Sequence, residues 1–306
     1  MGEDHTGTDD WLQIRTMKAD DVDQVLDMWR ELGRHRDVDN LNIFYQADPE
    51  GFFVAIDTRS GRLVATCCCV RQHPSLFSIG MYAVVKELQG RGLGLRLWKT
   101  AIRRMGDSNA SLNCYATNVG LYRDRAGFAL VEPWVIVVFT SSAVTADRLP
   151  EPSKELRVVP VGTLLPQVIA YDRSVHRYDR TEVVTLTVRD PHGFTRAVVR
   201  RQAGRDVVCG FGRIGRSVLG GAILGPVYAE NVDVAGALLR VLVEGYPLAR
   251  DGLCMKVPGC NPDGCGLARS LGFVKCSEVL RCYRNEKTQA RVEHIYALHD
   301  NNFCTF

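Results

Sequence analysis

The chain has 306 residues and a hydrophobic content of 46%, which suffices for two ordinary domains with substantial cores. Its net charge of +3 is too small to indicate nucleic-acid binding, and no uninterrupted apolar run approaches the roughly 20 residues of a membrane span. The start of the chain is polar and acidic, unlike a secretion signal. We therefore expect a disordered leader over residues 1–10 and a cytoplasmic protein without membrane or nucleic-acid partners.

Hydrophobic periodicity and turn residues divide the first half of the chain into ten elements. In order they are a strand, two helices, three strands, a helix, a strand, a helix and a strand, expected at about residues 11–17, 20–32, 38–46, 51–57, 63–72, 76–85, 95–105, 110–116, 118–126 and 128–140.

The most informative segment is the turn between the third of those three adjacent strands and the following helix. Gly90, Gly92 and Gly94 remove side chains from this turn, so several backbone N–H groups can point at one anion. The helix dipole and Arg91 add positive charge at the same place. The turn has neither the Gly-Lys-Ser/Thr ending of a P-loop nor the Gly-x-Gly-x-x-Gly spacing of a dinucleotide fingerprint. It is therefore predicted to hold a pyrophosphate of another kind.

The spacing Gln89-x-x-Gly92-x-Gly94 resembles the acyl-coenzyme A loop of the GNAT N-acetyltransferase superfamily, and the order of elements around it is that of the family. The resemblance implies that the fourth and fifth strands splay apart to admit the pantetheine arm of acetyl-CoA. It also implies a set of coenzyme-binding positions, namely Ala83, Val84, Val85, Gln89, Gly90, Arg91, Gly92, Leu93, Gly94 and Asn118. For Asn118 the alternative is a cap of the following helix.

Tyr122 is the candidate catalytic residue. In the family, a tyrosine after the fifth strand gives a proton to the departing thiolate, and Leu121-Tyr122 before Gly127 resembles that segment. Tyr122 lies five residues before Gly127 instead of the usual four, and a packing tyrosine is the alternative.

The general base is left open by the sequence. Deprotonating a lysine-like amine at neutral pH costs about 4–5 kcal/mol, and the strand over residues 75–85 carries no carboxylate to assist. Glu132, His73 and groups from the second half are candidates, and an ordered water relay is the mechanism that we expect.

The second half repeats the plan of the first after a linker over residues 143–155 that contains Pro150 and Pro152. Its strands and helices are expected at about residues 156–160, 164–175, 180–186, 195–201, 207–214, 218–227, 234–242, 253–257, 265–271 and 273–283, with an added edge strand over 291–298.

The second copy lacks the features that chemistry needs. Glu230 and Asp233 stand where the first copy has its glycine turn, and carboxylates there would repel a pyrophosphate. Leu267 replaces the tyrosine. The segment Tyr171–Arg180 resembles a stretch of the YitH-like acetyltransferase domain; it is interpreted as a salt-bridged loop or as a polar amine site at the domain junction.

Eleven cysteines and seven histidines show neither Cys-x-x-Cys nor His-x-x-x-His spacing, so we expect reduced, mostly buried thiols and no metal.

Together these features predict an α+β protein of two tandem GNAT-like domains, each a mixed, mostly antiparallel twisted sheet flanked by helices. Residues 11–142 are expected to form the catalytic domain and 156–306 a degenerate, YitH-like domain. The predicted activity is transfer of acetyl from acetyl-CoA to a primary amine of a small molecule by direct attack, as a monomer or homodimer. The alternatives are a protein lysine or N-terminal acetyltransferase and a non-catalytic acyl-CoA sensor or scaffold.

Overall fold

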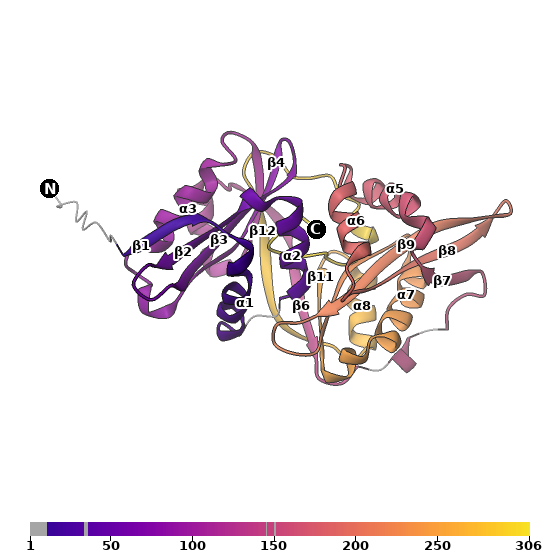
Figure 1. Ribbon diagram of the computed structural model, residues 1–306. Coiled ribbons are helices and arrows are strands. Elements are labelled where there is room, and N and C mark those ends of the chain that lie inside the picture. The colour runs from indigo at the N-terminus through magenta and orange to yellow at the C-terminus, as the bar shows by residue number, and fades with distance from the viewer. Residues whose placement is uncertain (1–10, 34–35, 145, 150) are drawn as a thin grey trace.

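The computed structural model describes residues 11–33, 36–144, 146–149 and 151–306, and the predicted leader lies outside these ranges. Within them the chain forms one continuous sheet of 13 strands with helices packed against it (Figure 1). The first half contains β1 (Leu12–Thr16), α1 (Val22–Glu31), α2 (Val38–Ala47), β2 (Phe52–Asp57), β3 (Arg62–His73), β4 (Leu76–Val84), α3 (Leu93–Arg103), β5 (Asn109–Cys114), α4 (Val119–Ala126) and β6 (Leu130–Ser141).

The second half repeats this order. It contains β7 (Leu156–Pro160), α5 (Leu165–His176), α6 (Thr181–Arg189), β8 (Phe194–Gln202), β9 (Arg205–Arg216), β10 (Ala222–Ala229), α7 (Val232–Gly245), β11 (Leu253–Pro258), α8 (Pro262–Ser270), β12 (Val274–Tyr283) and β13 (Ile295–Ala297). The predicted α+β class, with a mixed and mostly antiparallel sheet, is confirmed.

The two halves exchange their last long strands. The strand order is β1-β2-β3-β4-β5-β12-β6-β11-β10-β9-β8-β7, with β13 attached to β10. Strand β12 of the second half therefore pairs with β5, and β6 of the first half pairs with β11, while β6 and β12 pair with each other at the centre. The domain boundaries expected at residues 142 and 156 stay a prediction. One sheet contains the strands on both sides of these boundaries.

Each half contains one parallel pair that separates along its length. Strands β4 and β5 pair from Leu76 to Ile79, and β10 and β11 pair from Ala222 to Leu224. The predicted splay of the fourth and fifth strands is thus confirmed. In the second half, β13 pairs with β10 beyond the end of the parallel ladder. The edge strand expected over 291–298 is instead this short, fully buried strand inside the protein.

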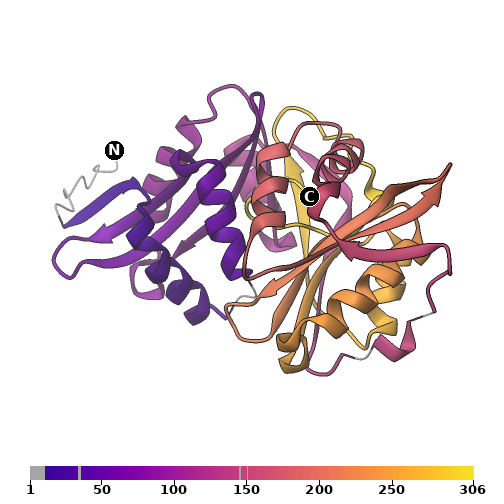
Figure 2. The same cartoon turned by 45° about the vertical axis from the view of Figure 1, so that its right-hand side comes forward.

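The segment after β13 runs back through the middle of the molecule, where the chain ends in Figures 1 and 2. Residues 298–306 are all buried. Two glycines allow their close approach: a side chain at Gly225 would collide with the carbonyl oxygen of Leu298, and one at Gly80 would collide with that of Asn302. The tail therefore packs against β10 and then against β4.

A buried ion cluster also ties the halves together. Arg213 on β9 is fully buried, and its guanidinium binds Asp37, which caps α2, and Asp190, which follows α6. Burial raises the pKa of Asp37, and the nearby Arg213 opposes that change. The charged atoms are thus paired across the boundary between the two halves.

Candidate active site

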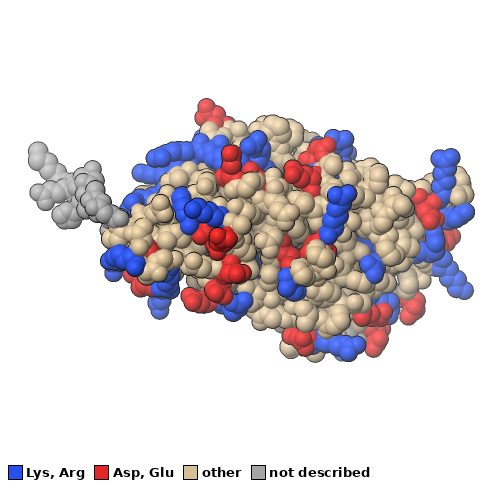
Figure 3. Space-filling model, viewed as in Figure 1, with Lys and Arg blue, Asp and Glu red and all other residues tan. Residues whose placement is uncertain are grey.

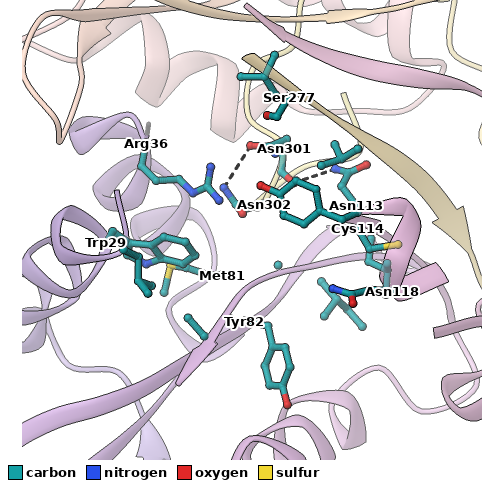
Figure 4. Close-up of a pocket in the computed structure, with 18 of the residues that line it drawn as sticks. Trp29, Arg36, Met81, Tyr82, Asn113, Cys114, Asn118, Ser277, Asn301 and Asn302 are labelled. Atoms are coloured by element: carbon teal, nitrogen blue, oxygen red, sulfur yellow. Dashed lines mark hydrogen bonds between the residues drawn. The ribbon is translucent and has the colours of Figure 1, made fainter. Parts of the chain in front are cut away.

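A cavity of about 620 Å³ opens where β4 and β5 separate (Figure 4). Of the residues predicted to bind coenzyme or to act in catalysis, those that line it are Ala83, Val84, Gln89, Asn118 and Tyr122. In Figure 4, Tyr82 and Asn118 lie at one end, and Ser277 with Asn301 lies at the other.

Strand β4 carries an irregularity at the wall of this cavity. Met81 has φ of 51°, a left-handed conformation that is uncommon for a residue with a side chain. The ladder with β3 shifts at this point, and the hydroxyl of Thr66 donates to the Met81 carbonyl at 2.6 Å. Backbone strain of this kind persists where surrounding contacts hold it, and it is common at functional sites.

Backbone polarity follows from the register of β4. Val85 donates its N–H to the Val64 carbonyl on β3 at 2.9 Å. Because antiparallel pairs alternate, the preceding Val84 turns its N–H and carbonyl to the open side. The Val84 carbonyl there accepts from Gln89 Nε2 at 2.9 Å. Of the backbone positions predicted to meet the pantetheine arm, Val84 thus faces the opening, whereas Val85 packs in the core and does not line the cavity.

The glycine turn adopts the conformation that its residues allow. Gly90 and Gly92 have φ of 76° and 78°, and Gly92 is the N-cap of α3 without any side-chain cap. The helix begins at Leu93, two residues before the predicted start, and its first turn holds no carboxylate. Its first N–H groups have no partner within the helix, as at any helix start. Gly94 leaves room for the Tyr82 ring, because a side chain there would overlap the Tyr82 hydroxyl.

Tyr122 on α4 lines the same cavity as β4. Its ring packs against Trp98 of α3 with centroids 5.5 Å apart. Burial raises the pKa of its phenol, so the hydroxyl remains protonated at neutral pH. Asn118 is the N-cap residue of α4 but its side chain makes no cap hydrogen bond, and Figure 4 shows it beside the cavity.

The remaining predicted coenzyme residues form the turn before α3 and its first residues, next to Gln89, and do not line the cavity; they are Gly90, Arg91, Gly92, Leu93 and Gly94. The proposed bases also lie elsewhere. Glu132 pairs with Lys287 at 3.2 Å, and His73 contacts Ser75 at 3.3 Å. The described part of the cavity wall contains no Asp, Glu or His.

Sequence reasoning missed the far end of the cavity. It is lined by Arg36 and Asn113 of the first half and by second-half residues that the exchanged strands and the tail bring there, namely Lys256, Cys276, Ser277, Val279, Asn301 and Asn302. Only the pairing of the exchanged strands and the path of the tail could have revealed them, because the second-half residues among them lie more than 110 positions from Val138, the last first-half residue of the wall.

The corresponding region of the second half is closed. Asn231 caps α7 through its side chain, which accepts from Val234 N–H at 3.0 Å, and Glu230 pairs with Arg200 at 3.2 Å. In the segment Tyr171–Arg180, Asp172 is buried near Arg180 at 3.7 Å, and burial raises its pKa to about 6. Arg173 and Asp179 form an exposed pair at 2.6 Å. None of these residues lines the cavity at β4.

Other classes of site find no support in the described residues. They contain no cluster of His, Cys, Asp or Glu with metal-binding geometry and no helix long and apolar enough to cross a membrane. Nine of the eleven cysteines are buried. On the face in Figure 3, basic and acidic side chains are interspersed over most of the surface instead of forming one extended basic patch.

Family comparisons agree with this geometry. Residues 19–128 match the model of the acetyltransferase (GNAT) family, and residues 168–297 match that of an acetyltransferase (GNAT) domain. The chain therefore belongs to the GNAT acetyltransferases and carries two such domains in tandem.

Three similar proteins span most of the chain. Holothin acyltransferase of Pseudoalteromonas sp. (strain SANK 73390) is 23% identical over 257 residues, covering 83% of this chain and 82% of that protein. A crystal structure from Pyrococcus horikoshii, described only provisionally as an acetyltransferase, covers 99% of both chains with a TM-score of 0.74 and 18% identity. A tandem GNAT protein from the clavulanic acid biosynthesis pathway covers 89% of this chain and 98% of its own, with a TM-score of 0.61 and 14% identity. At these identities the two structures support the fold alone.

Proposed function

We propose that the protein is a cytoplasmic acyl-CoA-dependent N-acyltransferase that moves acetyl from acetyl-CoA to a primary amine of a small molecule. The observation that carries this proposal is the cavity at the splay of β4 and β5, which lies beside an uncapped, glycine-rich start of α3. An uncapped helix start suits a pyrophosphate, and an open strand edge suits an extended amide chain.

The coenzyme would lie along β4. Its pyrophosphate would accept from the N–H groups around Gly92 to Gly94, and its pantetheine amides would pair with the outward-facing groups of Val84. The thioester would then reach the irregular backbone at Met81, with Tyr122 across the cavity.

The reaction needs little from the side chains. A neutral amine attacks the thioester carbonyl, a C–N bond forms, and the C–S bond breaks as the tetrahedral intermediate collapses. Tyr122 gives its proton to the departing thiolate of CoA, and the amine proton leaves through water. Burial favours the protonated phenol, which suits a group that must hold a proton until the thiolate forms.

Deprotonation of the amine is assigned to a water relay. The described cavity wall offers no carboxylate or imidazole, but it does offer the polar side chains Asn113, Ser277 and Asn301. Such groups hold ordered water, and solvent in the cavity completes the path.

Cavity size supports a small acceptor. A volume of about 620 Å³ falls in the usual range for small-molecule sites, and the second half with its tail covers the far end. A protein lysine or N-terminal amine would need an open groove past this end.

Thiol release from acetyl-CoA with a panel of amines, amino sugars and peptides separates these cases. Coenzyme binding without turnover on any acceptor would favour the sensor alternative.

The coenzyme site is tested by Gly92→Val, with Gly61→Val as the matched control. Both glycines have left-handed φ, 78° and 69°, and a β-carbon at either meets nothing within 4 Å, so both substitutions strain the backbone without a clash. We expect Gly92→Val to weaken CoA binding by calorimetry at least about tenfold, because its side chain stands among the N–H groups that hold the phosphate. Gly61→Val, in the β2–β3 turn, should bind normally. Equal affinity of the two variants would contradict the site.

A further inference from the structure

The end of the cavity farthest from Tyr82 contains a buried lysine. Lys256 on β11 is 4% exposed and lines the cavity. It lies opposite Val138 of β6, which lies opposite Ser277 of β12. Directly opposed residues of neighbouring antiparallel strands share a face of the sheet, so the three form a row across the exchanged strands. All three line the cavity.

Lys256 has no counter-ion among the residues that the structure describes. Its ammonium makes no hydrogen bond or ion pair with any described residue. The described lining of the cavity also contains no Asp or Glu. A buried cation without a partner is costly, and such groups are normally paired. A negatively charged molecule that enters the cavity would therefore be stabilised beside Lys256.

Neighbouring groups make the same end more attractive to an anion. Arg36 also lines the cavity, with its guanidinium stacked over Trp29 at 4.6 Å. Lys256 and Arg36 both act electrostatically on the buried Cys254, so the two cations lie in one region. Asn301 accepts from Asn302 Nδ2 at 3.4 Å through its amide oxygen, which leaves its NH₂ group as a donor. Figure 4 shows Arg36, Ser277 and Asn301 around this end.

The coenzyme does not supply the anion under the arrangement proposed above. Its phosphates lie at the start of α3, and the pantetheine arm and the acetyl group are neutral. The ammonium of Lys256 carries one positive charge and three N–H donors. A carboxylate balances that charge and accepts from those donors.

We propose, on the basis of the acyltransferase function above, that the acceptor is an amino-carboxylic acid whose carboxylate binds Lys256. Lys256 Nζ and the Asn301 amide donate to the carboxylate, and the amine at the other end of the acceptor points to the thioester at Met81. The second half thereby determines acceptor specificity, because its exchanged strands and tail provide these groups.

Paired acceptors test the proposal: the common L-amino acids and ω-amino acids of three to six carbons, each against its carboxamide. Thiol release with acetyl-CoA gives kcat/KM for each member. A charge-assisted hydrogen bond is worth about 1.5–3 kcal/mol, so we expect the acid to be favoured over the amide by roughly 10- to 100-fold. Lys256→Met should abolish this preference, and Lys256→Arg should restore part of it. The control is Lys154→Met, an exposed lysine in the linker, which should keep the full preference.

Saturation-transfer NMR on the CoA-loaded protein with the same pairs reports binding even without turnover. Acids that bind to the wild type and not to Lys256→Met support the proposal. Amides that bind as well as acids, or no bound acid at all, overturn it. If neither CoA binding nor turnover is found, the enzymatic function fails as well; if amines are acetylated without any preference for acids, only the present inference fails.

An acyl chain that ends in a carboxylate would present the same chemistry from the donor side. Succinyl-CoA is therefore compared with butyryl-CoA, using a neutral amine that the enzyme accepts. A preference for succinyl-CoA that disappears in Lys256→Met would place the carboxylate on the donor and overturn its assignment to the acceptor. Equal use of the two donors leaves the acceptor as its source and supports the proposal.

Discussion

The two halves contain the same opening in their sheets and occupy it differently. In the first half, the pairing of β4 and β5 ends at Ile79 and Leu112, and a cavity follows. In the second half, the pairing of β10 and β11 ends at Leu224 and Met255, and β13 adds to β10 beyond that point. The side chain of Asn261, which caps α8, donates to the Ile295 carbonyl at 3.0 Å and holds β13 there.

The starts of the corresponding helices differ in the same sense. Helix α3 begins at Leu93, and its N-cap residue Gly92 provides no side-chain cap, so its first N–H groups remain available for a ligand. Helix α7 is capped by Asn231 next to Glu230. The open start of α3 is suited to binding an anion. At the start of α7, the Asn231 side chain already accepts from the Val234 N–H.

This difference shows how one fold supports two roles. Strand β13 closes the opening of the second half, and the tail that follows it continues across the molecule, where Asn301 and Asn302 reach the cavity of the first half. A second half that bound its own coenzyme could not hold β13 in this place. We infer that the closed copy supports the open one and completes its site.

The largest effect is expected from Arg213→Met, which tests whether the halves depend on each other. Arg213 is fully buried, and its loss leaves Asp37 and Asp190 buried without their cation. Breaking such a pair costs about 3–5 kcal/mol of unfolding free energy. Because the sheet is shared, hydrogen exchange should rise together in peptides of β2–β3 and of β8–β9. Faster exchange in the second half alone would show that the halves are independent.

Acidity and a surface control sharpen this test. Burial raises the pKa of Asp37 in the folded state, so its contribution to stability falls as the pH rises through that pKa. The difference in unfolding free energy between the wild type and Arg213→Met should therefore shrink in acid, where a protonated Asp37 needs no counter-ion. Arg157 pairs with Asp206 at 2.6 Å but is 54% exposed, and Arg157→Met should cost no more than about 1 kcal/mol at any pH.

A smaller but more specific effect is expected from Tyr122→Phe, because the corresponding residue of the second half is Leu267. Loss of a proton donor should lower kcat about 100-fold or more, with the affinity for CoA unchanged. The control is Tyr45→Phe, whose hydroxyl donates to the Met17 carbonyl at 3.2 Å away from the cavity. Full turnover by Tyr122→Phe would mean that Tyr122 only packs against Trp98 and does not donate a proton.

Local signals predicted the features that depend on local chemistry. The glycines at 90 and 92 indicated a turn without side chains before a helix, and both lie in such a turn directly before α3. Element order predicted the family and the splay of β4 and β5. The presence of Glu230 and Asp233 indicated that the second helix start is unsuited to phosphate, and its side-chain cap agrees with that interpretation.

Long-range pairing was beyond the sequence. Strands β6 and β12 follow equivalent helices, so nothing in their own patterns decides whether each pairs within its half or across the boundary. The tail gave a similarly weak signal, because its burial depends on close contacts at Gly80 and Gly225, far away in the chain. The polar end of the cavity, including Lys256, follows from both features and was therefore not predicted.

The smallest effect is expected at the charge beside the open helix start. Arg91 is exposed, and a charge in such a position contributes about 0.3–1 kcal/mol to anion binding, so Arg91→Gln should weaken CoA binding about two- to fivefold. The loss should shrink at 0.5 M salt, because exposed charges are screened. Arg205→Gln removes an exposed charge from the second half and should leave CoA binding unchanged at either salt concentration. An equal loss in both variants would mean that CoA responds to the overall charge of the protein, and the electrostatic distinction between the two helix starts would then be wrong.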